Sequence, residues 1–200
     1  MSLQGEVKDG DLIKGDERML EHQGYGLVQL IHGDGKGKTT SAIGQAIRCA
    51  GSGRRVMIVF FDKGGETHYF ERKVLDEILN IDYEVTGRDR IKESGGFDFS
   101  ITQEDRDEAR RGLEIAKSAL LSGDYHLVVL DEINSTVALK MLDTHRVIDV
   151  IKNRKPDVEV ILTGRNPVSE LLEIADLISE VKMTKHYFYS GVKAREGLDY

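Results

Sequence analysis

The chain has 200 residues, which is enough for one well-packed α/β domain and too few for two domains of ordinary size. Its formal net charge of −7 disfavours broad electrostatic attraction to nucleic acid, so we expect no nucleic-acid partner. No apolar run approaches a membrane span and no signal peptide opens the chain, so we expect no membrane partner. The single cysteine, Cys49, cannot form an internal disulfide, and we expect it in the core of a cytoplasmic protein.

Residues 1–25 are polar, with only scattered apolar positions. A segment with this pattern does not bury enough apolar surface to fold alone. We expect an N-terminal arm that is either flexible or lies over a neighbouring surface. Residues 26–200 are then expected to form the folded domain.

A glycine-rich turn joins the first predicted strand, residues 26–31, to the first predicted helix, which ends near Ala50 with Gly51 as its C-cap. The glycines let the backbone curl so that successive N–H groups point at one anion, and the helix adds its own free N–H groups. This context predicts a phosphate-binding loop. Its residues are Gly33, Asp34, Gly35, Lys36, Gly37, Lys38, Thr39 and Thr40.

Two side chains of this loop have specific expected roles. Lys38 would reach the terminal phosphates of a nucleotide, and the Thr39 hydroxyl would hold a magnesium ion. The common P-loop pattern has glycine where this chain has His32, so a tighter or differently shaped turn is expected. A flexible glycine linker is the alternative, but linkers do not carry Gly-Lys-Thr-Thr between a strand and a helix.

The second predicted strand, residues 56–61, is apolar almost throughout, as in a parallel strand covered on both faces. Lys63 and Gly64 follow it, where the ligand-binding loops of doubly wound sheets gather. Residues 69–79 are predicted to form a helix and residues 81–85 a short strand.

A long loop is predicted over residues 86–100 because this stretch is glycine-rich and charged. The next helix is expected to begin at Thr102, with Asp105 completing a capping box. Apolar residues recur along this helix at the spacing of one buried face. They are Ala109, Leu113, Ala116 and Leu120.

Residues 125–132 give the second strong signal, because four apolar residues run into Asp131 and Glu132 in the form of a Walker B strand. The strand would carry both acids to the sheet edge beside the phosphate loop. There they would hold a magnesium ion together with Thr39. Many buried strands end in an acid, but the combination with Gly-Lys-Thr-Thr is specific.

Residues 158–163 form another predicted strand, followed by Arg165, a helix near 168–174 and a strand near 177–181. This alternation predicts a single domain with an α/β fold, in which helices flank a mostly parallel sheet. The architecture expected is that of a P-loop NTPase of the RecA-like type.

Residues 182–200 contain glycines, basic residues and aromatics without a helical period. A disordered tail is one interpretation, although the aromatic density exceeds that of a solvated tail. Lys185 and His186 lie in this stretch, and no spacing around His186 indicates a metal site.

These residues resemble the P-loop family of ATP:corrinoid adenosyltransferases over about residues 26–200. That family has a phosphate loop of the form GNGKGKTT after a non-glycine residue, with Asp34 here in place of the usual Asn. Further short segments along the chain are also similar to this family, and those at the C-terminal end, from Lys185 onward, are the most distinctive. They are Arg48–Gly51, Lys63–Gly64, Val129–Glu132, Leu162–Arg165, Ala175–Leu177, Lys185–His186, Gly191–Ala194 and Gly197–Tyr200.

The resemblance implies that a reduced cobalt(I) corrinoid attacks the ribose 5′ carbon of ATP and that tripolyphosphate leaves. Cobalt(I) is itself the nucleophile, so the protein need only orient the substrates and stabilise charge on the triphosphate. The resemblance assigns catalytic roles to Lys38, Thr39 and Glu132, and magnesium to Thr39, Asp131 and Glu132. It assigns substrate binding to the phosphate loop and to Arg48, Lys63, Gly64, Phe97, Phe99, Arg165, Lys185 and His186.

An aromatic pair in this family wedges under the corrin ring and removes the lower axial ligand of cobalt. Phe97 and Phe99 are the counterparts, although the family usually has Trp at the second position and this chain has no Trp. Residues two apart in an extended segment face the same way, so both rings could reach the corrin. Packing of both rings in the core is the alternative.

The family resemblance also implies a homodimer, in which the N-terminal arm of one subunit could cover the site of the other. It further implies a cobalamin or cobinamide-type corrinoid as substrate and a flavoprotein as electron donor. Two other classes of function remain open at this stage. They are a generic P-loop ATPase or kinase and a nucleotide-binding regulator with little turnover. The ending from Lys185 to Tyr200 favours the adenosyltransferase.

Overall fold

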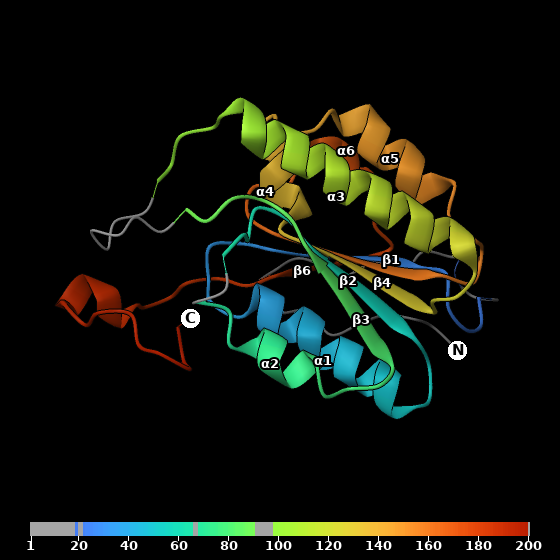
Figure 1. The fold of residues 1–200 in the computed structure, drawn as a ribbon, viewed down its shortest axis with the longest axis horizontal. Helices are drawn as coiled ribbons and strands as arrows, with labels where there is room; N and C mark the ends of the chain where they lie inside the picture. Colours follow the sequence, from blue (N-terminus) through green and yellow to red (C-terminus); the bar gives the residue numbers. More distant parts are fainter. Residues whose placement is uncertain (1–18, 20–21, 66–67, 91–97, 200) are drawn as a thin grey trace, which may run out of the picture.

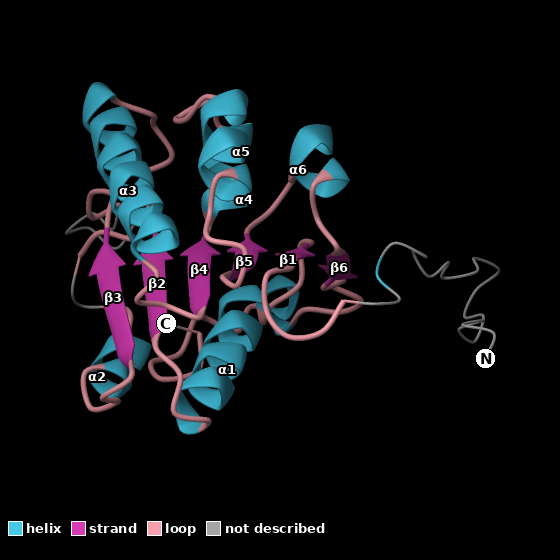
Figure 2. Cartoon of the chain, turned by 90° about the vertical axis from the view of Figure 1, so that its right-hand side faces the viewer, coloured by secondary structure: helices cyan, strands magenta, loops and turns pink. Residues whose placement is uncertain are grey.

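The computed structural model describes residue 19 and residues 22–65, 68–90 and 98–199. Within these residues six strands form one sheet in the order β3-β2-β4-β5-β1-β6, and neighbouring strands are parallel throughout. Helices cover both faces of the sheet (Figures 1 and 2). The predicted α/β fold is therefore confirmed, while most of the predicted arm, residues 1–25, lies outside the described residues.

The elements alternate along the chain as expected for a parallel sheet with helical crossovers. The strands are β1 (Val28–His32), β2 (Val56–Phe60), β3 (Ile81–Val85), β4 (Leu127–Asp131), β5 (Glu159–Thr163) and β6 (Leu177–Glu180). The helices are α1 (Lys38–Gly51), α2 (Glu71–Leu75), α3 (Gln103–Ser122), α4 (Ile133–Ala138), α5 (Thr144–Lys152) and α6 (Ser169–Glu173), followed by a 3-10 helix (Tyr187–Ser190).

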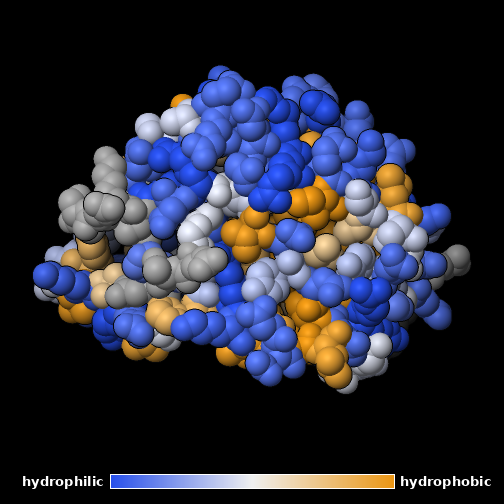
Figure 3. All heavy atoms as spheres, in the orientation of Figure 1, coloured by the Kyte–Doolittle hydropathy of each residue, from blue (hydrophilic) through white to orange (hydrophobic). Residues whose placement is uncertain are grey.

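Two hydrophobic clusters lie on opposite faces of the sheet. Helices α1 and α2 cover one face, and α3, α4, α5 and α6 cover the other, above the sheet in Figure 1. The β4 strand is buried along its whole length, which explains why its sequence is continuously apolar rather than alternating. Polar side chains cover most of the upper helices in Figure 3, with hydrophobic atoms gathered below them in the right half of the view.

The strand order places β5 between β1 and β4. The phosphate loop follows β1, and Asp131 ends β4, so these two parts of the site face each other across the carboxyl end of β5. This arrangement lets Thr163, the last residue of β5, lie between them. The described helices include none that is both long and apolar enough to cross a membrane.

Helix α3 begins as its sequence predicts. The Thr102 hydroxyl accepts a hydrogen bond from the Asp105 N–H, and the Asp105 carboxylate accepts one from the Thr102 N–H at 2.6 Å, which completes the capping box. The predicted apolar stripe of this helix is buried against the sheet. It consists of Ala109, Leu113, Ala116 and Leu120.

Helices α4 and α5 have no counterpart among the predicted elements. The short α4 begins directly after Glu132, which has a left-handed φ of 64° and gives no ordinary capping signal. Helix α5 does carry a signal, because the Asp143 side chain accepts from the Arg146 N–H at 3.0 Å and Val147 and Ile151 are buried.

Two predicted boundaries are wrong. Helix α1 includes Gly51 and is capped by Ser52, whose N–H donates to the Cys49 carbonyl at 3.0 Å, and the left-handed residue is Gly53. The helix predicted over residues 69–79 is confined to α2, because the chain after Leu75 continues in three-residue turns. Cys49 is buried in the core, as predicted.

Candidate active site

The phosphate loop lies against the backbone that follows β6. The Gly35 N–H donates to the Val181 carbonyl at 2.8 Å. A Cβ atom on Gly33 would lie 2.4 Å from the same oxygen, and the φ of Gly33 is +108°. Because no larger residue fits this contact, packing alone constrains the sequence of the loop at Gly33.

Lys38 lies inside the loop and is 7% exposed. Its ammonium donates to the Gly35 carbonyl at 2.8 Å. Burial lowers the pKa of Lys38, and the positive charge of Arg165 lowers it further, while Glu132 opposes the shift. An anion bound beside this ammonium would therefore stabilise its charged form, and the role predicted for Lys38 stays a prediction.

Asp131 ends β4 and is almost completely buried. One carboxylate oxygen accepts from the Thr163 hydroxyl at 2.6 Å, and the other accepts from the Thr39 hydroxyl at 3.3 Å. Thr163 also accepts from the Glu132 N–H at 2.9 Å. Together these bonds fix the Asp131 carboxylate beside the phosphate loop, where the Walker B pattern predicts it.

Glu132 adopts the left-handed backbone conformation, which is uncommon for a residue with a side chain. Its carboxylate accepts from the Ser135 hydroxyl at 2.6 Å, and that hydroxyl accepts from the Arg165 N–H at 2.9 Å. The loops that follow β4 and β5 are therefore joined through one serine.

Lys63 reaches the same site from the loop after β2. Its ammonium donates to the Thr39 hydroxyl at 2.8 Å and forms an ion pair with the second oxygen of Asp131. Burial disfavours the ammonium, but the charges of Asp131 and Glu132 outweigh this and hold the pKa of Lys63 above its ordinary value. The loop is packed so closely that a Cβ on Gly64 would lie 2.1 Å from the Gly87 carbonyl oxygen.

The donors predicted for magnesium have a suitable chemistry and separation. Mg²⁺ takes oxygen ligands at about 2.0–2.1 Å, so two adjacent ligands of an octahedral ion lie about 2.9 Å apart. Thr39 Oγ1 and Asp131 Oδ2 lie 3.3 Å apart, close to this value. These two residues would suit a magnesium ion as oxygen ligands, and Glu132 follows Asp131 in the chain.

The C-terminal segment also reaches the phosphate loop. The Lys36 ammonium donates to the Leu198 carbonyl and pairs with Asp199, which also accepts from the Tyr187 hydroxyl. The Asp34 carboxylate accepts from the Met183 N–H at 3.1 Å. Two of the predicted loop residues, Lys36 and Asp34, thus contact residues of the C-terminal segment.

Within the part of the chain that the structure describes, the other predicted site residues have no recorded hydrogen bond or ion pair with the residues around Asp131. The His186 ring accepts from the Phe188 N–H at 3.1 Å and so caps the 3-10 helix, and Lys185 is exposed beside it. Phe99 is 83% exposed, so it does not pack in the core. Phe97 lies outside the described residues.

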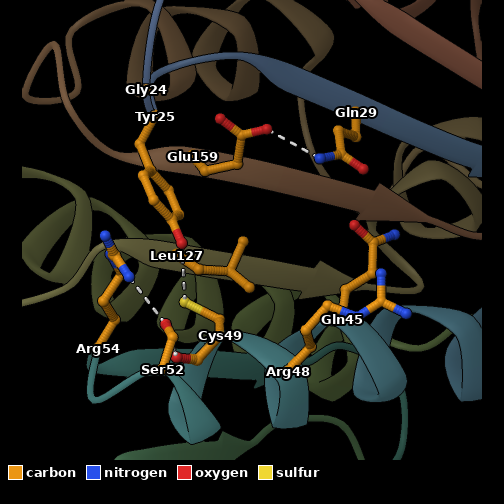
Figure 4. Close-up of a pocket in the computed structure, with 10 residues that line it drawn as sticks. All are labelled: Gly24, Tyr25, Gln29, Gln45, Arg48, Cys49, Ser52, Arg54, Leu127 and Glu159. Atoms are coloured by element: carbon orange, nitrogen blue, oxygen red, sulfur yellow. Dashed lines mark hydrogen bonds between the residues drawn. The ribbon is translucent and has the colours of Figure 1, made fainter.

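Arg48 lies away from this site, ten residues along α1 from Lys38, a distance of about 15 Å at 1.5 Å per residue. It lines a cavity of about 380 Å³ near the amino ends of β1, β4 and β5 (Figure 4). In that view the Tyr25 hydroxyl points at the Cys49 sulfur, 3.8 Å away. The predicted substrate-binding role of Arg48 remains a prediction.

Sequence reasoning did not assign a role to Thr163, Ser135 or Asp199. Thr163 orients Asp131, Ser135 orients Glu132, and Asp199 holds Lys36. A polar residue at the end of the buried strand β5 was the available signal for Thr163. Nothing in the spacing of Ser135 or Asp199 indicated these contacts.

Comparison with known proteins identifies the family. A family described as "ATP:corrinoid adenosyltransferase BtuR/CobO/CobP" matches residues 24–200, which include every residue of the site just described. The chain belongs to this family. Its substrates are ATP and a corrinoid, and its reaction is that of an adenosyltransferase rather than a generic ATPase or kinase.

Several curated proteins are similar to this adenosyltransferase. The corrinoid adenosyltransferase of Escherichia coli K12 is 35% identical, over 94% of this chain and 92% of the relative. The corrinoid adenosyltransferase CobA of Salmonella typhimurium LT2 is 34% identical, over 98% of this chain and 95% of the relative. An uncharacterized protein of Nostoc sp. PCC 7120 is 35% identical, but the matched region spans only 48% of that longer relative.

Proposed function

We propose that the carboxyl edge of this sheet binds ATP with magnesium and transfers the 5′-deoxyadenosyl group to the cobalt(I) centre of the corrinoid, with release of tripolyphosphate. One observation carries this proposal. The Lys63 ammonium donates to the Thr39 hydroxyl and pairs with Asp131, and Lys38, the residue before Thr39, is buried within the phosphate loop. Such a site suits a triphosphate that gains charge as it leaves.

The proposed reaction needs no side chain as a general base or nucleophile. Cobalt(I) in the corrinoid substrate supplies the electron pair for the new bond to the 5′ carbon, and the bond from that carbon to the triphosphate oxygen breaks. The chain must hold the carbon in line with cobalt and neutralise the leaving group. We assign the second task to the phosphate loop, above all to Gly35, Gly37, Lys38, Thr39 and Thr40.

We assign the magnesium ion to Thr39 and Asp131, with Glu132 next to it. When bound, magnesium would neutralise charge on the triphosphate oxygens. The chain's own residues prepare this site in advance, since Thr163 fixes the Asp131 carboxylate and Ser135 fixes that of Glu132. Both contacts hold oxygen donors at the edge where the phosphates would lie.

We assign the corrin side of the site to Phe97 and Phe99, with Lys185 and His186 as further candidates. The exposure of Phe99 supports this assignment, because a ring that is 83% exposed has no core role to fulfil. Behind it, Arg90 donates to the carbonyls of Asp98 and Ser100 at 3.0 and 2.7 Å. The exposed ring is thus carried on a backbone anchored on both sides.

We further propose a homodimer in which the arm of one subunit covers the site of the other, a cobalamin or cobinamide-type substrate, and a flavoprotein that supplies electrons. Exposed apolar side chains on the edge strand β6, Leu177 and Ile178, support a protein contact there. The unpaired thiol of Cys49 agrees with a cytoplasmic location. Sedimentation equilibrium of the full chain would measure the oligomeric state.

The products test the proposed reaction. With ATP, magnesium and chemically reduced cobalamin, we expect tripolyphosphate to appear in step with adenosylated corrinoid. Lys38→Ala removes a charge-assisted contact of about 1.5–3 kcal/mol, so we expect at least about tenfold weaker ATP binding or turnover. Lys152→Ala, on the exposed face of α5, is the matched control and should match the unmodified protein.

The same assay identifies the competing function. Steady release of ADP and phosphate without a corrinoid would overturn the proposal and indicate an ordinary ATPase. Unchanged ATP kinetics in Lys38→Ala would mean that this loop does not hold the triphosphate.

A further inference from the structure

Three side chains from different parts of the fold meet at the proposed magnesium position: Lys63 from the loop after β2, Thr39 from the first turn of α1 and Asp131 from the end of β4. The Lys63 ammonium lies 2.8 Å from Thr39 Oγ1 and is ion-paired with Asp131 Oδ2. The two oxygens themselves lie 3.3 Å apart. The ammonium therefore contacts both oxygens that the proposed function gives to the metal ion.

A buried carboxylate needs a counterion. The side chain of Asp131 is 1% exposed, and its other oxygen is taken by the Thr163 hydroxyl, so Lys63 is the cation that compensates its charge. An ammonium and a magnesium ion on the same two oxygens would repel each other strongly at that separation. Metal binding and the present position of Lys63 therefore exclude each other.

The backbone of Lys63 is fixed by hydrogen bonds at its N–H and its carbonyl, and its side chain is 13% exposed. The Lys63 N–H donates to the Thr86 carbonyl at 2.9 Å, and its own carbonyl accepts from the Arg72 guanidinium at 2.5 Å. Arg72 also donates to the Gly65 carbonyl at 2.7 Å. A displaced ammonium thus stays within one side-chain length of the site, where the phosphates of ATP would attract it.

We infer that Lys63 is a resident counterion of the metal site, which magnesium displaces only when ATP arrives to receive the released ammonium. This inference rests on the proposed magnesium–ATP site. Without nucleotide the lysine opposes metal binding, and with nucleotide it becomes a ligand of the departing triphosphate. Lys63 thereby couples the affinity for metal to the presence of ATP.

Binding of Mn²⁺, followed by the electron paramagnetic resonance of the free ion, tests the coupling without any turnover. Without nucleotide we expect Lys63→Met to bind Mn²⁺ at least about tenfold more tightly than the unmodified protein, because one opposing charge is gone. With ATP present the gain should shrink, and ATP itself should bind more weakly to Lys63→Met. Equal or weaker Mn²⁺ binding by Lys63→Met without nucleotide would overturn the inference.

Two variants keep the result interpretable. Lys63→Gln can still donate a hydrogen bond to Asp131, so we expect it to fold, but it lacks the positive charge. It should therefore bind Mn²⁺ more tightly than the unmodified protein, as Lys63→Met does. A folded Lys63→Gln with unchanged Mn²⁺ affinity would also overturn the inference. Lys73→Met, on the nearby helix α2, is the matched control and should leave Mn²⁺ binding unchanged.

The unmodified protein separates this inference from the proposed function. If it binds Mn²⁺ with ATP and Asp131→Asn abolishes that binding, the metal site stands, and the Lys63 variants decide the coupling alone. If Asp131→Asn binds Mn²⁺ with ATP as well as the unmodified protein does, the proposed metal site itself is wrong, and the inference falls with it.

Discussion

Single residues at the carboxyl edge of the sheet adopt conformations that disfavour folding. Asp62, Glu132 and Asn166 all have left-handed φ values, of 52°, 64° and 50°, and each follows the end of a strand. Such a residue typically costs about 1–3 kcal/mol unless its surroundings compensate. Three of the four described non-glycine residues with positive φ thus lie where the loops after β2, β4 and β5 leave the sheet, and the fourth, Lys140, follows α4. Such conformations are common at ligand-binding sites.

Phe99 provides the prediction at this scale. Because Phe99 is 83% exposed, Phe99→Ala should leave the melting temperature nearly unchanged, whereas loss of a core Phe costs about 3–5 kcal/mol. If the ring displaces the lower ligand of cobalt, the variant should impair adenosylation of cobalt(II) corrinoid with a mild reductant far more than that of pre-reduced cobalt(I). Both assays and a thermal melt measure this.

Leu79→Ala is the matched control. Leu79 follows α2 in the sequence, its side chain is fully exposed, and it has no proposed role. It should change neither assay. Equal losses of Phe99→Ala in both assays would count against the wedge, and a lowered melting temperature would indicate a packing role.

Among the elements, the phosphate loop depends on the segment after β6 as much as on its own sequence. A Cβ on Gly35 would lie 2.7 Å from the Val181 carbonyl oxygen and 2.9 Å from the Lys182 carbonyl carbon. Both are backbone atoms, which cannot rotate away as a side chain can. The predicted phosphate loop and the segment that follows the last strand of the sheet therefore fit together as one unit.

Gly35→Ala should break this fit, whereas Gly44→Ala should not. We expect Gly35→Ala to lower the free energy of unfolding by about 1–3 kcal/mol through the clash and to weaken ATP binding. Gly44 lies exposed within α1 with open space around it, so Gly44→Ala should raise the free energy of unfolding by about 0.5–1 kcal/mol. Urea unfolding and calorimetric ATP titration measure both; a Gly35→Ala protein as stable as the unmodified one would contradict the prediction.

The elements also show how far the sequence leads. Local patterns predicted the phosphate loop, the β4 strand with its two acids, and α3 with its capping box, because short-range spacing determines all three. The contact of Lys63 with Asp131 joins residues 68 apart in the chain, and only the strand order brings them together. The sequence did not predict helix α4, because this helix starts from Glu132, whose left-handed backbone gives no ordinary capping signal. Arg48 lies near the far end of α1, away from the phosphate loop that precedes this helix.

Across the whole molecule, one buried carboxylate links three parts of the fold. Asp105 at the start of α3 accepts from Arg88 at 2.9 Å and from Arg90 at 3.0 Å, both in the loop after β3. Arg90 also donates to Asp62 after β2 at 2.6 Å. Burial raises the pKa of Asp105, but hydrogen bonds from Thr102 and the two arginines outweigh it and hold that pKa below its ordinary value.

Acid should therefore destabilise the molecule through Asp105. A carboxyl whose pKa is lowered by folding stabilises the protein fully above its unfolded pKa of about 3.9, and that stability is lost as the pH falls through the folded value. Asp105→Asn should be less stable than the unmodified protein at pH 7 but should lose less stability between pH 5 and pH 3. Urea unfolding at each pH measures the slopes.

Asp107→Asn is the matched control on the same helix, with a side chain that is 58% exposed. Its pH dependence should stay close to that of the unmodified protein. Parallel slopes for Asp105→Asn and the unmodified protein would show that Asp105 does not set the acid limit.

The strand order has a consequence for the order in which the molecule assembles. Strand β1, the first to leave the ribosome, pairs with β5 and β6 among the described strands, and Gln29 contacts Glu159 across 130 residues of chain. At synthesis rates of about 5–20 residues per second, β1 waits roughly ten seconds for its first neighbour. During that time its apolar residues and the unformed phosphate loop remain unpaired, so the earliest part of the proposed nucleotide site to be made is among the last to fold.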